Sequence, residues 1–191
     1  MIKSIMIVGV GGQGSLLASR VLGRVAMDKG YDVKVSEVHG MSQRGGSVVT
    51  YVRFGDEAVA SPVIDRGGAD CIISFELLEA ARYTEFLKPG GTIVTSTQQI
   101  DPMPVIAGNA AYPEGLVEKM EAAGAVVDAI DALAIAEEAG SFKASNIVLM
   151  GRFSKYMPEI SKDEWLQAVA ACVPEKFREL NLKAFELGVK A

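Results

Sequence analysis

The segment that decides the fold is residues 2–14, which read IKSIMIVGVGGQG. Its first half is rich in branched apolar side chains, a pattern typical of a strand that is buried on both faces. Three glycines then follow in the spacing G-x-G-x-x-G, at Gly9, Gly11 and Gly14, and residues 15–29 carry an apolar stripe at helical spacing. A strand, a glycine loop and a helix in this order predict the opening unit of a Rossmann-like α/β fold.

Strand and helix patterns alternate along the rest of the chain. Strands are predicted at residues 31–38, 47–54, 70–74, 92–96 and 125–130. Helices are predicted at residues 76–87, 114–123, 131–139 and 145–156, with two more opening at Ser161 and Pro174. This alternation favours a mostly parallel sheet flanked by helices, followed by a helical C-terminal segment.

Two segments depart from that simple pattern. In residues 47–54 two sets of side chains alternate, and this strand is expected to lie at an edge or to run antiparallel. One set is Val48, Thr50, Val52 and Phe54, and the other is Val49, Tyr51 and Arg53. Residues 97–113 contain three prolines and are expected to be a loop with at most a short strand near Val105. Neither a repeat nor a linker is apparent, which predicts a single domain spanning residues 1–191.

Composition excludes several classes of protein. The formal net charge is −5, so binding to nucleic acid or to an anionic membrane surface is not expected. Two cysteines, Cys71 and Cys172, are too few for a four-cysteine iron–sulfur cluster, and with the single His39 they do not make a usual zinc site. No apolar run approaches the length of a membrane span, and the N-terminal apolar stretch is too short for a signal peptide. A reduced, cytoplasmic protein is therefore expected.

The glycine loop is the first candidate binding site. In the setting of strand, loop and helix, glycines permit a tight turn, close approach to a phosphate and close packing of the helix on the strand. The N–H groups at the start of the helix can then bind an anion. The candidate residues are Gly9, Gly11, Gly12, Gln13 and Gly14. A tight turn without any ligand is the structural alternative.

A second candidate site follows the second strand, in the run EVHGMSQRGG at residues 37–46. Arg44 is a fixed cation that can hold a phosphate or a carboxylate with two hydrogen bonds. Ser42 and Gln43 supply neutral hydrogen bonds, and Gly45 and Gly46 let the backbone reverse beside them. An exposed turn with an incidental arginine is the alternative. Neither a catalytic residue nor a metal ligand is expected in this chain.

Glu37 keeps an oxidoreductase alternative open. An acidic residue at the end of the second strand binds the ribose in enzymes that use NAD, and Glu37 stands roughly at that position. The chain could thus be a stand-alone NAD- or FAD-binding oxidoreductase, or a nucleotide-sensing module. His39 has the only imidazole, which could act as a general acid or base, although a structural role is more common for a lone histidine.

The two candidate segments, together with Asn146 and Gly151 in a later helix, resemble the gamma-type subunit of the 2-oxoacid:ferredoxin oxidoreductases. Within that family the chain is most similar to the small (beta) type of subunit found in indolepyruvate ferredoxin oxidoreductase. The run at residues 37–46 is the specific part, and the resemblance covers nearly the whole chain.

The resemblance implies a complex that oxidatively decarboxylates an aryl pyruvate such as indolepyruvate, passes electrons to ferredoxin and releases an acyl-CoA. Thiamine diphosphate, Mg and iron–sulfur clusters would reside on a large partner subunit, and this chain would bind none of them alone. Its own role would be to complete the active-site cleft and to help bind coenzyme A (CoA). The apolar last helix could instead support a homodimer when the chain is isolated.

Overall fold

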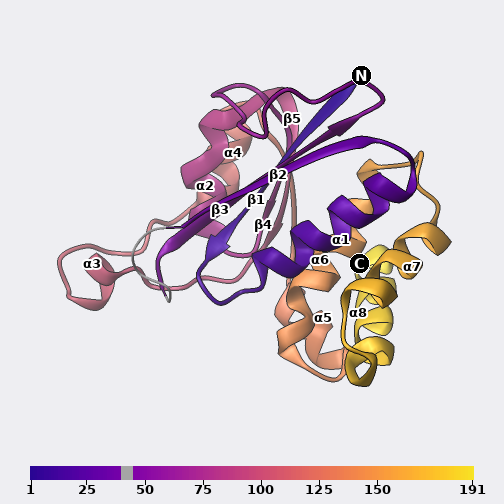
Figure 1. Cartoon of the computed structure of the whole chain (residues 1–191). Coiled ribbons are helices and arrows are strands. Elements are labelled where there is room, and N and C mark those ends of the chain that lie inside the picture. Colours follow the sequence, from indigo (N-terminus) through magenta and orange to yellow (C-terminus); the bar gives the residue numbers. More distant parts are fainter. Residues whose placement is uncertain (40–44) are drawn as a thin grey trace.

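A computed structural model of the chain describes residues 1–39 and 45–191. These residues form a six-stranded sheet with helices on both faces (Figure 1). The strands are β1 (Ile2–Val10), β2 (Asp32–His39), β3 (Ser47–Gly55), β4 (Ala69–Ser74), β5 (Leu87–Ser96) and β6 (Val126–Ile130). The α-helices are α1 (Ser15–Asp28), α2 (Leu77–Tyr83), α3 (Met103–Ile106), α4 (Leu116–Ala122), α5 (Ala132–Ala139), α6 (Ser145–Phe153), α7 (Lys162–Cys172) and α8 (Arg178–Lys190). Short 3-10 helices occupy Thr84–Phe86, Phe142–Ala144, Ser154–Tyr156 and Glu175–Phe177.

The sheet is mostly parallel, as the sequence predicts, and its strand order is β2-β3-β1-β4-β5-β6. Strand β3 runs antiparallel to both of its neighbours, β1 and β2. The expectation of an antiparallel third strand is therefore confirmed. The alternative that this strand lies at an edge is wrong, because β2 pairs with the outer side of β3 from Asp32 to His39 and takes the edge itself.

The register of the strands brings several chain segments together at one end of the sheet, where β1 and β4 finish. Val8 at the end of β1 pairs with Ser74 at the end of β4, so the turns that follow these two strands lie side by side. Because β3 runs in the opposite direction, its first residue, Ser47, pairs with Val10 at this same end of the sheet. In sheets of this kind the carboxyl ends of the parallel strands are where ligands bind.

Side chains of β1 enter the core on both faces of the sheet. Ile5 and Ile7 join a cluster with α1 and with α5 to α8, whereas Met6 and Val8 join a second cluster with α2 and α4. All four side chains are buried. A central parallel strand that is apolar on both faces is typical of sheets covered by two layers of helices.

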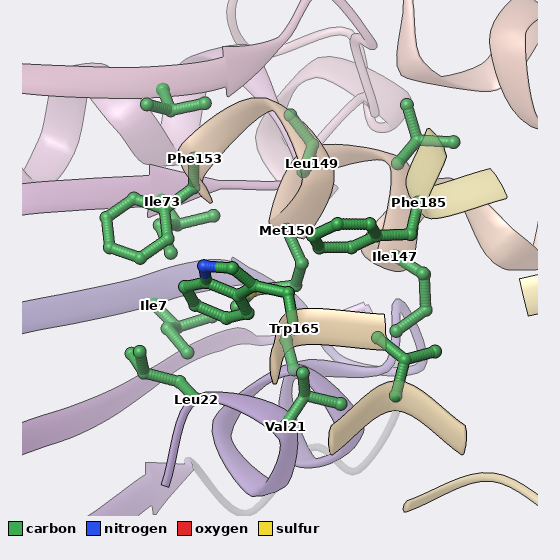
Figure 2. Close-up of a cluster of buried hydrophobic side chains, with 14 of the residues drawn as sticks. Ile7, Val21, Leu22, Ile73, Ile147, Leu149, Met150, Phe153, Trp165 and Phe185 are labelled. Carbon is green, nitrogen blue, oxygen red and sulfur yellow. The ribbon is translucent and has the colours of Figure 1, made fainter. Parts of the chain in front are cut away.

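Aromatic side chains fill the larger cluster (Figure 2). The Trp165 ring stacks on Phe185 at 6.0 Å between ring centroids, and it meets Phe153 edge-on at 6.2 Å. These residues come from α6, α7 and α8, so the C-terminal helices share one core with the sheet. Helix α8 packs against α5, α6 and α7, which accounts for much of its apolar surface.

Two expected elements differ from the structure. The predicted helix at residues 76–87 ends at Tyr83, because a 3-10 turn follows and β5 already begins at Leu87. Leu87 is buried and pairs with Ala69 of β4. No strand forms near Val105; instead, α3 forms a single turn in a loop that projects from the sheet (Figure 1). The fixed φ of proline suits the first turn of a helix, and Pro104 stands there.

Candidate functional site

The glycine loop turns sharply between β1 and α1. Gly14 caps α1 with a φ of 88°, a left-handed conformation that side chains other than glycine rarely adopt. A Cβ atom at Gly14 would lie 2.4 Å from Nδ2 of Asn146, and one at Gly9 would lie 3.1 Å from the ring of Phe75. The loop therefore needs glycine for its conformation at one end and for close packing at both ends.

Several donors of this loop are already used within the protein. The Val10 N–H donates to Oε1 of Gln13 at 2.7 Å, and the Gly11 N–H donates to the Gly46 carbonyl at 2.8 Å. Gln13 in turn donates its own backbone N–H to the Val10 carbonyl at 3.2 Å. The first half of the loop is thus closed by internal hydrogen bonds.

The second half of the loop remains available to a ligand. Within residues 1–39 and 45–191, no acceptor is bonded to the N–H groups of Gly12, Gly14, Ser15 or Leu16. Helix α1 also has no side-chain cap in that part of the chain. Unpaired N–H groups and the positive end of a 14-residue helix dipole favour an anion at this point.

A cleft of about 330 Å³ opens beside these donors. Its lining comes from the glycine loop, from the end of β5 and from the segment that leads into α6. The residues are Gly12, Gln13, Gly14, Gln98, Leu133, Phe142, Lys143, Ser145 and Asn146. Lys143 is exposed, and Phe142 keeps 55% of its surface exposed. The cleft therefore combines backbone donors, a cation and an apolar ring.

Asn146 connects α6 to the glycine loop. Its side chain is buried, and Nδ2 donates to the Gly14 carbonyl at 3.2 Å. The sequence singled out Asn146 only within a family resemblance. In the structure it holds the loop at the point where α1 begins and also lines the cleft.

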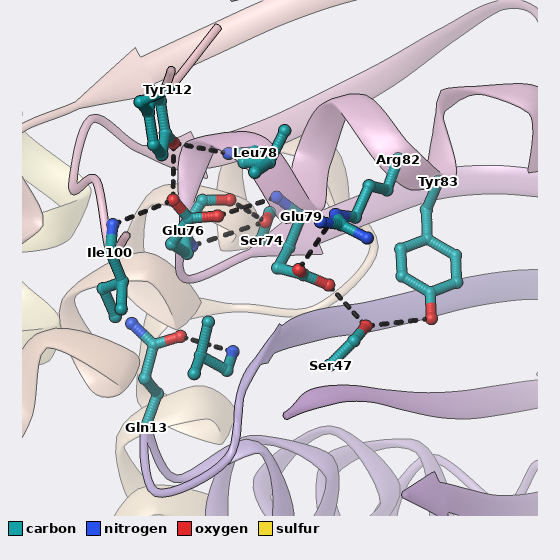
Figure 3. A network of polar contacts seen from close by, with 11 residues as sticks. Gln13, Ser47, Ser74, Glu76, Leu78, Glu79, Arg82, Tyr83, Ile100 and Tyr112 are labelled. Carbon is teal, nitrogen blue, oxygen red and sulfur yellow. Dashed lines mark hydrogen bonds and ion pairs between the residues drawn. The ribbon is translucent and has the colours of Figure 1, made fainter. Parts of the chain in front are cut away.

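Two carboxylates, those of Glu76 and Glu79, form a hydrogen-bond network where α2 begins after β4 (Figure 3). Glu76 caps α2 by accepting from the Glu79 N–H, and it also accepts from the Tyr112 hydroxyl at 2.5 Å and from the Ile100 N–H at 3.1 Å. Burial and the hydrogen bond to Glu76 raise the pKa of Tyr112. The start of the projecting loop is thereby tied to α2.

Glu79 anchors the beginning of β3. The Ser47 hydroxyl donates to Oε2 of Glu79 at 2.5 Å, and the Arg82 guanidinium lies 3.4 Å from the other carboxylate oxygen. Burial raises the pKa of Glu79. Because the neighbouring Gly46 carbonyl accepts from Gly11, this contact fixes the segment that touches the glycine loop.

Most of the candidate residues that the structure describes lie close together. Gly9, Gly11, Gly12, Gln13 and Gly14 form the loop, and Gly46 contacts it directly while Gly45 precedes that contact with a φ of 78°. Ser42, Gln43 and Arg44 lie outside the described residues, as does the side chain of His39.

Glu37 is separated from the glycine loop. It lies on the edge strand β2, where Oε2 is 3.4 Å from the Thr50 hydroxyl of β3. Adjacent strands are about 4.8 Å apart, so two spacings place the backbone of β2 about 10 Å from β1. The sequence could not reveal this separation, because it does not show that β3 inserts between the two strands.

Sequence reasoning missed five cleft residues, which are Gln98, Leu133, Phe142, Lys143 and Ser145. Gln98 could have been found, since it follows a predicted strand and the carboxyl ends of parallel strands meet at one edge. The others occupy a 3-10 turn and the starts of two helices, and no spacing in the sequence connects them to the loop.

Among the residues that the structure describes, we find neither a cluster of metal-binding side chains nor a membrane-spanning helix. No group of three or more histidine, cysteine, aspartate or glutamate side chains there is arranged to bind a metal ion. In the same part of the chain, none of the helices has the length and hydropathy to cross a membrane.

Comparison with known proteins gives consistent matches over nearly the whole chain. The family model for pyruvate ferredoxin/flavodoxin oxidoreductase matches residues 4–191. The indolepyruvate oxidoreductase subunit IorB of Thermococcus kodakarensis is 44% identical, and the match covers 98% of this chain and 95% of that protein.

Two solved structures have the same fold. The keto/oxoacid ferredoxin oxidoreductase gamma subunit of Geobacter sulfurreducens has a TM-score of 0.73 at 25% identity, covering 98% of this chain and 96% of that one. The 2-oxoglutarate:ferredoxin oxidoreductase of Magnetococcus marinus, solved with 2-oxoglutarate, coenzyme A and succinyl-CoA, has a TM-score of 0.74 at 20% identity. That match covers 99% of this chain and 30% of the Magnetococcus chain. The chain therefore belongs to the pyruvate ferredoxin/flavodoxin oxidoreductase family, as a gamma-type subunit of a multisubunit 2-oxoacid:ferredoxin oxidoreductase.

Proposed function

We propose that this subunit provides the phosphate-binding part of a CoA site in an indolepyruvate-type oxidoreductase. The observation that carries the proposal is the cleft lined by Lys143 and by Gly12 and Gly14, whose N–H groups have no acceptor among the described residues. CoA carries a diphosphate and a ribose phosphate, and such groups are bound well by helix N-termini and by cations. Arg44, two residues from Gly46 in the chain, would add a second cation.

The proposed division of labour leaves the reacting groups on a large partner subunit. Thiamine diphosphate, Mg and iron–sulfur clusters would be bound there, and ferredoxin would take electrons from the complex. The 44% identity to an indolepyruvate oxidoreductase subunit supports an aryl pyruvate as substrate. This chain would close one side of the cleft and bring the CoA thiol toward the reacting acyl group. A cytoplasmic location follows from the same proposal.

The position of Glu37 bears on the alternative of a stand-alone NAD- or FAD-dependent enzyme. In such enzymes the acid that binds the ribose ends the strand next to the first strand of the sheet. Here β3 occupies that position and Glu37 is one strand further away. This geometry disfavours the NAD reading. Purification distinguishes the readings further: a brown complex with cluster absorbance supports the proposal, whereas a yellow protein containing only this chain contradicts it.

Calorimetric titration of CoA into the assembled complex tests the proposal directly. We expect Arg44→Ala and Lys143→Ala each to weaken CoA binding by about tenfold, the effect of losing one charge-assisted hydrogen bond. Lys190→Ala is the matched control, because Lys190 is exposed on α8 and does not line the cleft. Unchanged affinity in both Arg44→Ala and Lys143→Ala would refute the proposed CoA site.

A further inference from the structure

Gln98, which the sequence did not single out, sets the geometry of the glycine loop. We propose that it is a positioning residue for the anion site and that it acts through Gln13. The inference rests on the proposed CoA site, but it can fail separately from that proposal. It is carried by a chain of hydrogen bonds from the end of β5 to the loop between β1 and α1.

The backbone of Gln98 is fixed on both sides. Its N–H donates to the Ser96 hydroxyl at 3.2 Å, and its carbonyl accepts from the Leu77 N–H of α2 at 2.9 Å. Two residues later, the Ile100 N–H donates to the buried carboxylate of Glu76. Gln98 therefore stands at a rigid point, where β5 leaves the sheet beside α2.

The side chain of Gln98 meets that of Gln13. Oε1 of Gln98 accepts from Nε2 of Gln13 at 3.0 Å, and the same nitrogen donates to the Phe75 carbonyl at 3.0 Å. Both N–H bonds of the Gln13 amide are therefore engaged. Its oxygen must then face the other way, where it accepts from the Val10 N–H.

This orientation determines which donors the loop offers. With Val10 bound to the Gln13 side chain and the Gln13 N–H bound to the Val10 carbonyl, the turn over residues 10–13 is closed. Gly12 is left with its N–H unpaired at the cleft, within the described chain. Without Gln98, one N–H of the Gln13 amide loses its acceptor and the amide can rotate away from Val10. The loop would then lose the conformation that presents the Gly12 N–H to an anion.

Steady-state kinetics of the assembled complex, with CoA as the varied substrate, test this inference. We expect Gln98→Met to raise the KM for CoA roughly 3- to 10-fold, the effect of one neutral hydrogen bond, with kcat and the KM for the 2-oxoacid within about twofold of the wild type. Gln13→Met should give a similar increase. The double variant should be no worse than Gln13→Met, because both changes break the same chain of contacts. Gln99→Met is the control, since Gln99 is the exposed neighbour of Gln98.

The outcomes separate this inference from the proposed function. If Arg44→Ala and Lys143→Ala weaken CoA binding but Gln98→Met leaves the KM for CoA unchanged, only the role of Gln98 is refuted. Additive effects of Gln98→Met and Gln13→Met would also refute it, because Gln98 would then act independently of Gln13. If the Gln98→Met subunit does not assemble into the complex, the KM for CoA of the Gln13→Met complex decides whether the inference holds. Failure of both variants to assemble would assign the pair to folding and overturn the inference.

Discussion

A methyl group added at Gly188 would collide with the backbone of a neighbouring helix. Gly188 lies on α8 where it crosses α6, and a Cβ atom there would be 2.0 Å from the Val148 carbonyl oxygen and 2.8 Å from its carbon. On the other side of the crossing, a Cβ atom at Gly151 would lie 2.1 Å from the Phe185 carbonyl oxygen. Two glycines thus allow the two helix backbones to touch.

The cost of Gly188→Ala follows from this geometry. Carbon and oxygen atoms that are not bonded seldom approach within about 3.3 Å, so the helices would have to separate by about 1 Å. Overpacking costs about 1–3 kcal/mol, and the upper end applies because the methyl group meets backbone, which cannot rotate away. Alanine recovers about 1 kcal/mol through its higher helix propensity. The net loss in the free energy of unfolding is therefore about 2 kcal/mol, which lowers Tm by about 4–8 °C in a chain of this size.

Thermal unfolding followed by circular dichroism measures the change, with Gly23→Ala as the control. Gly23 is a buried glycine inside α1, but a Cβ atom there would meet only Val33 and Val35 at 3.9 and 3.8 Å, which are ordinary contact distances. Gly23→Ala should therefore raise stability by up to about 1 kcal/mol. A Gly188→Ala variant as stable as Gly23→Ala would refute the close contact between α6 and α8.

Three smaller changes probe other parts of the fold. Tyr112→Phe removes the hydroxyl that binds Glu76 and should lower the free energy of unfolding by about 1–2 kcal/mol, measured by urea titration. Ser161→Ala removes the N-cap of α7 and should cost about 1 kcal/mol in the same assay. Hydrogen bonds from Lys29 and then Ser161 lower the pKa of Glu164 to about 2. Since the folded pKa lies below that of the unfolded chain, this stabilisation is present above about pH 4 and is lost as the pH falls toward 2. Glu164→Gln should flatten this part of the dependence of the free energy of unfolding on pH. An unchanged pH dependence would contradict the contact of Glu164 with Lys29.

Local signals in the sequence predicted much of the fold, because short-range physics decides helix starts and buried strands. The helix predicted to open at Ser161 does begin there, with a capping box between Ser161 and Glu164, and Asp131 caps α5 by accepting from the Ala134 N–H. The strand 2–8 and the helix that follows the glycine loop are confirmed with small shifts in their bounds. In each case the residues that determine the element lie within a few positions of one another.

Nonlocal pairing accounts for what the sequence did not predict. The insertion of β3 between β1 and β2 depends on hydrogen bonds between strands, and no local pattern records it. The same holds for Lys143, which lies near the glycine loop only after α6 has packed on α1, whereas Gln98 could have been inferred from its place after a predicted parallel strand. Residues within the loop could be predicted as a candidate site from their local spacing, whereas a residue on a distant segment such as Lys143 could not.

The position of β3 also supports the proposed binding of CoA over that of NAD. In dinucleotide enzymes the second strand brings an acid to the glycine loop, where it binds a ribose that carries two hydroxyl groups. An acid at that point would repel the phosphate on the ribose of CoA. Here β3 moves Glu37 away and brings its own start to the loop, so that the Gly46 carbonyl and Ser47 stand there instead. Lys143 also lines the cleft, and there is no acid among the described residues of that lining. Strand β3 thus places a carbonyl and a hydroxyl beside the loop where dinucleotide enzymes have an acid, which supports the proposed binding of a ligand with an additional phosphate.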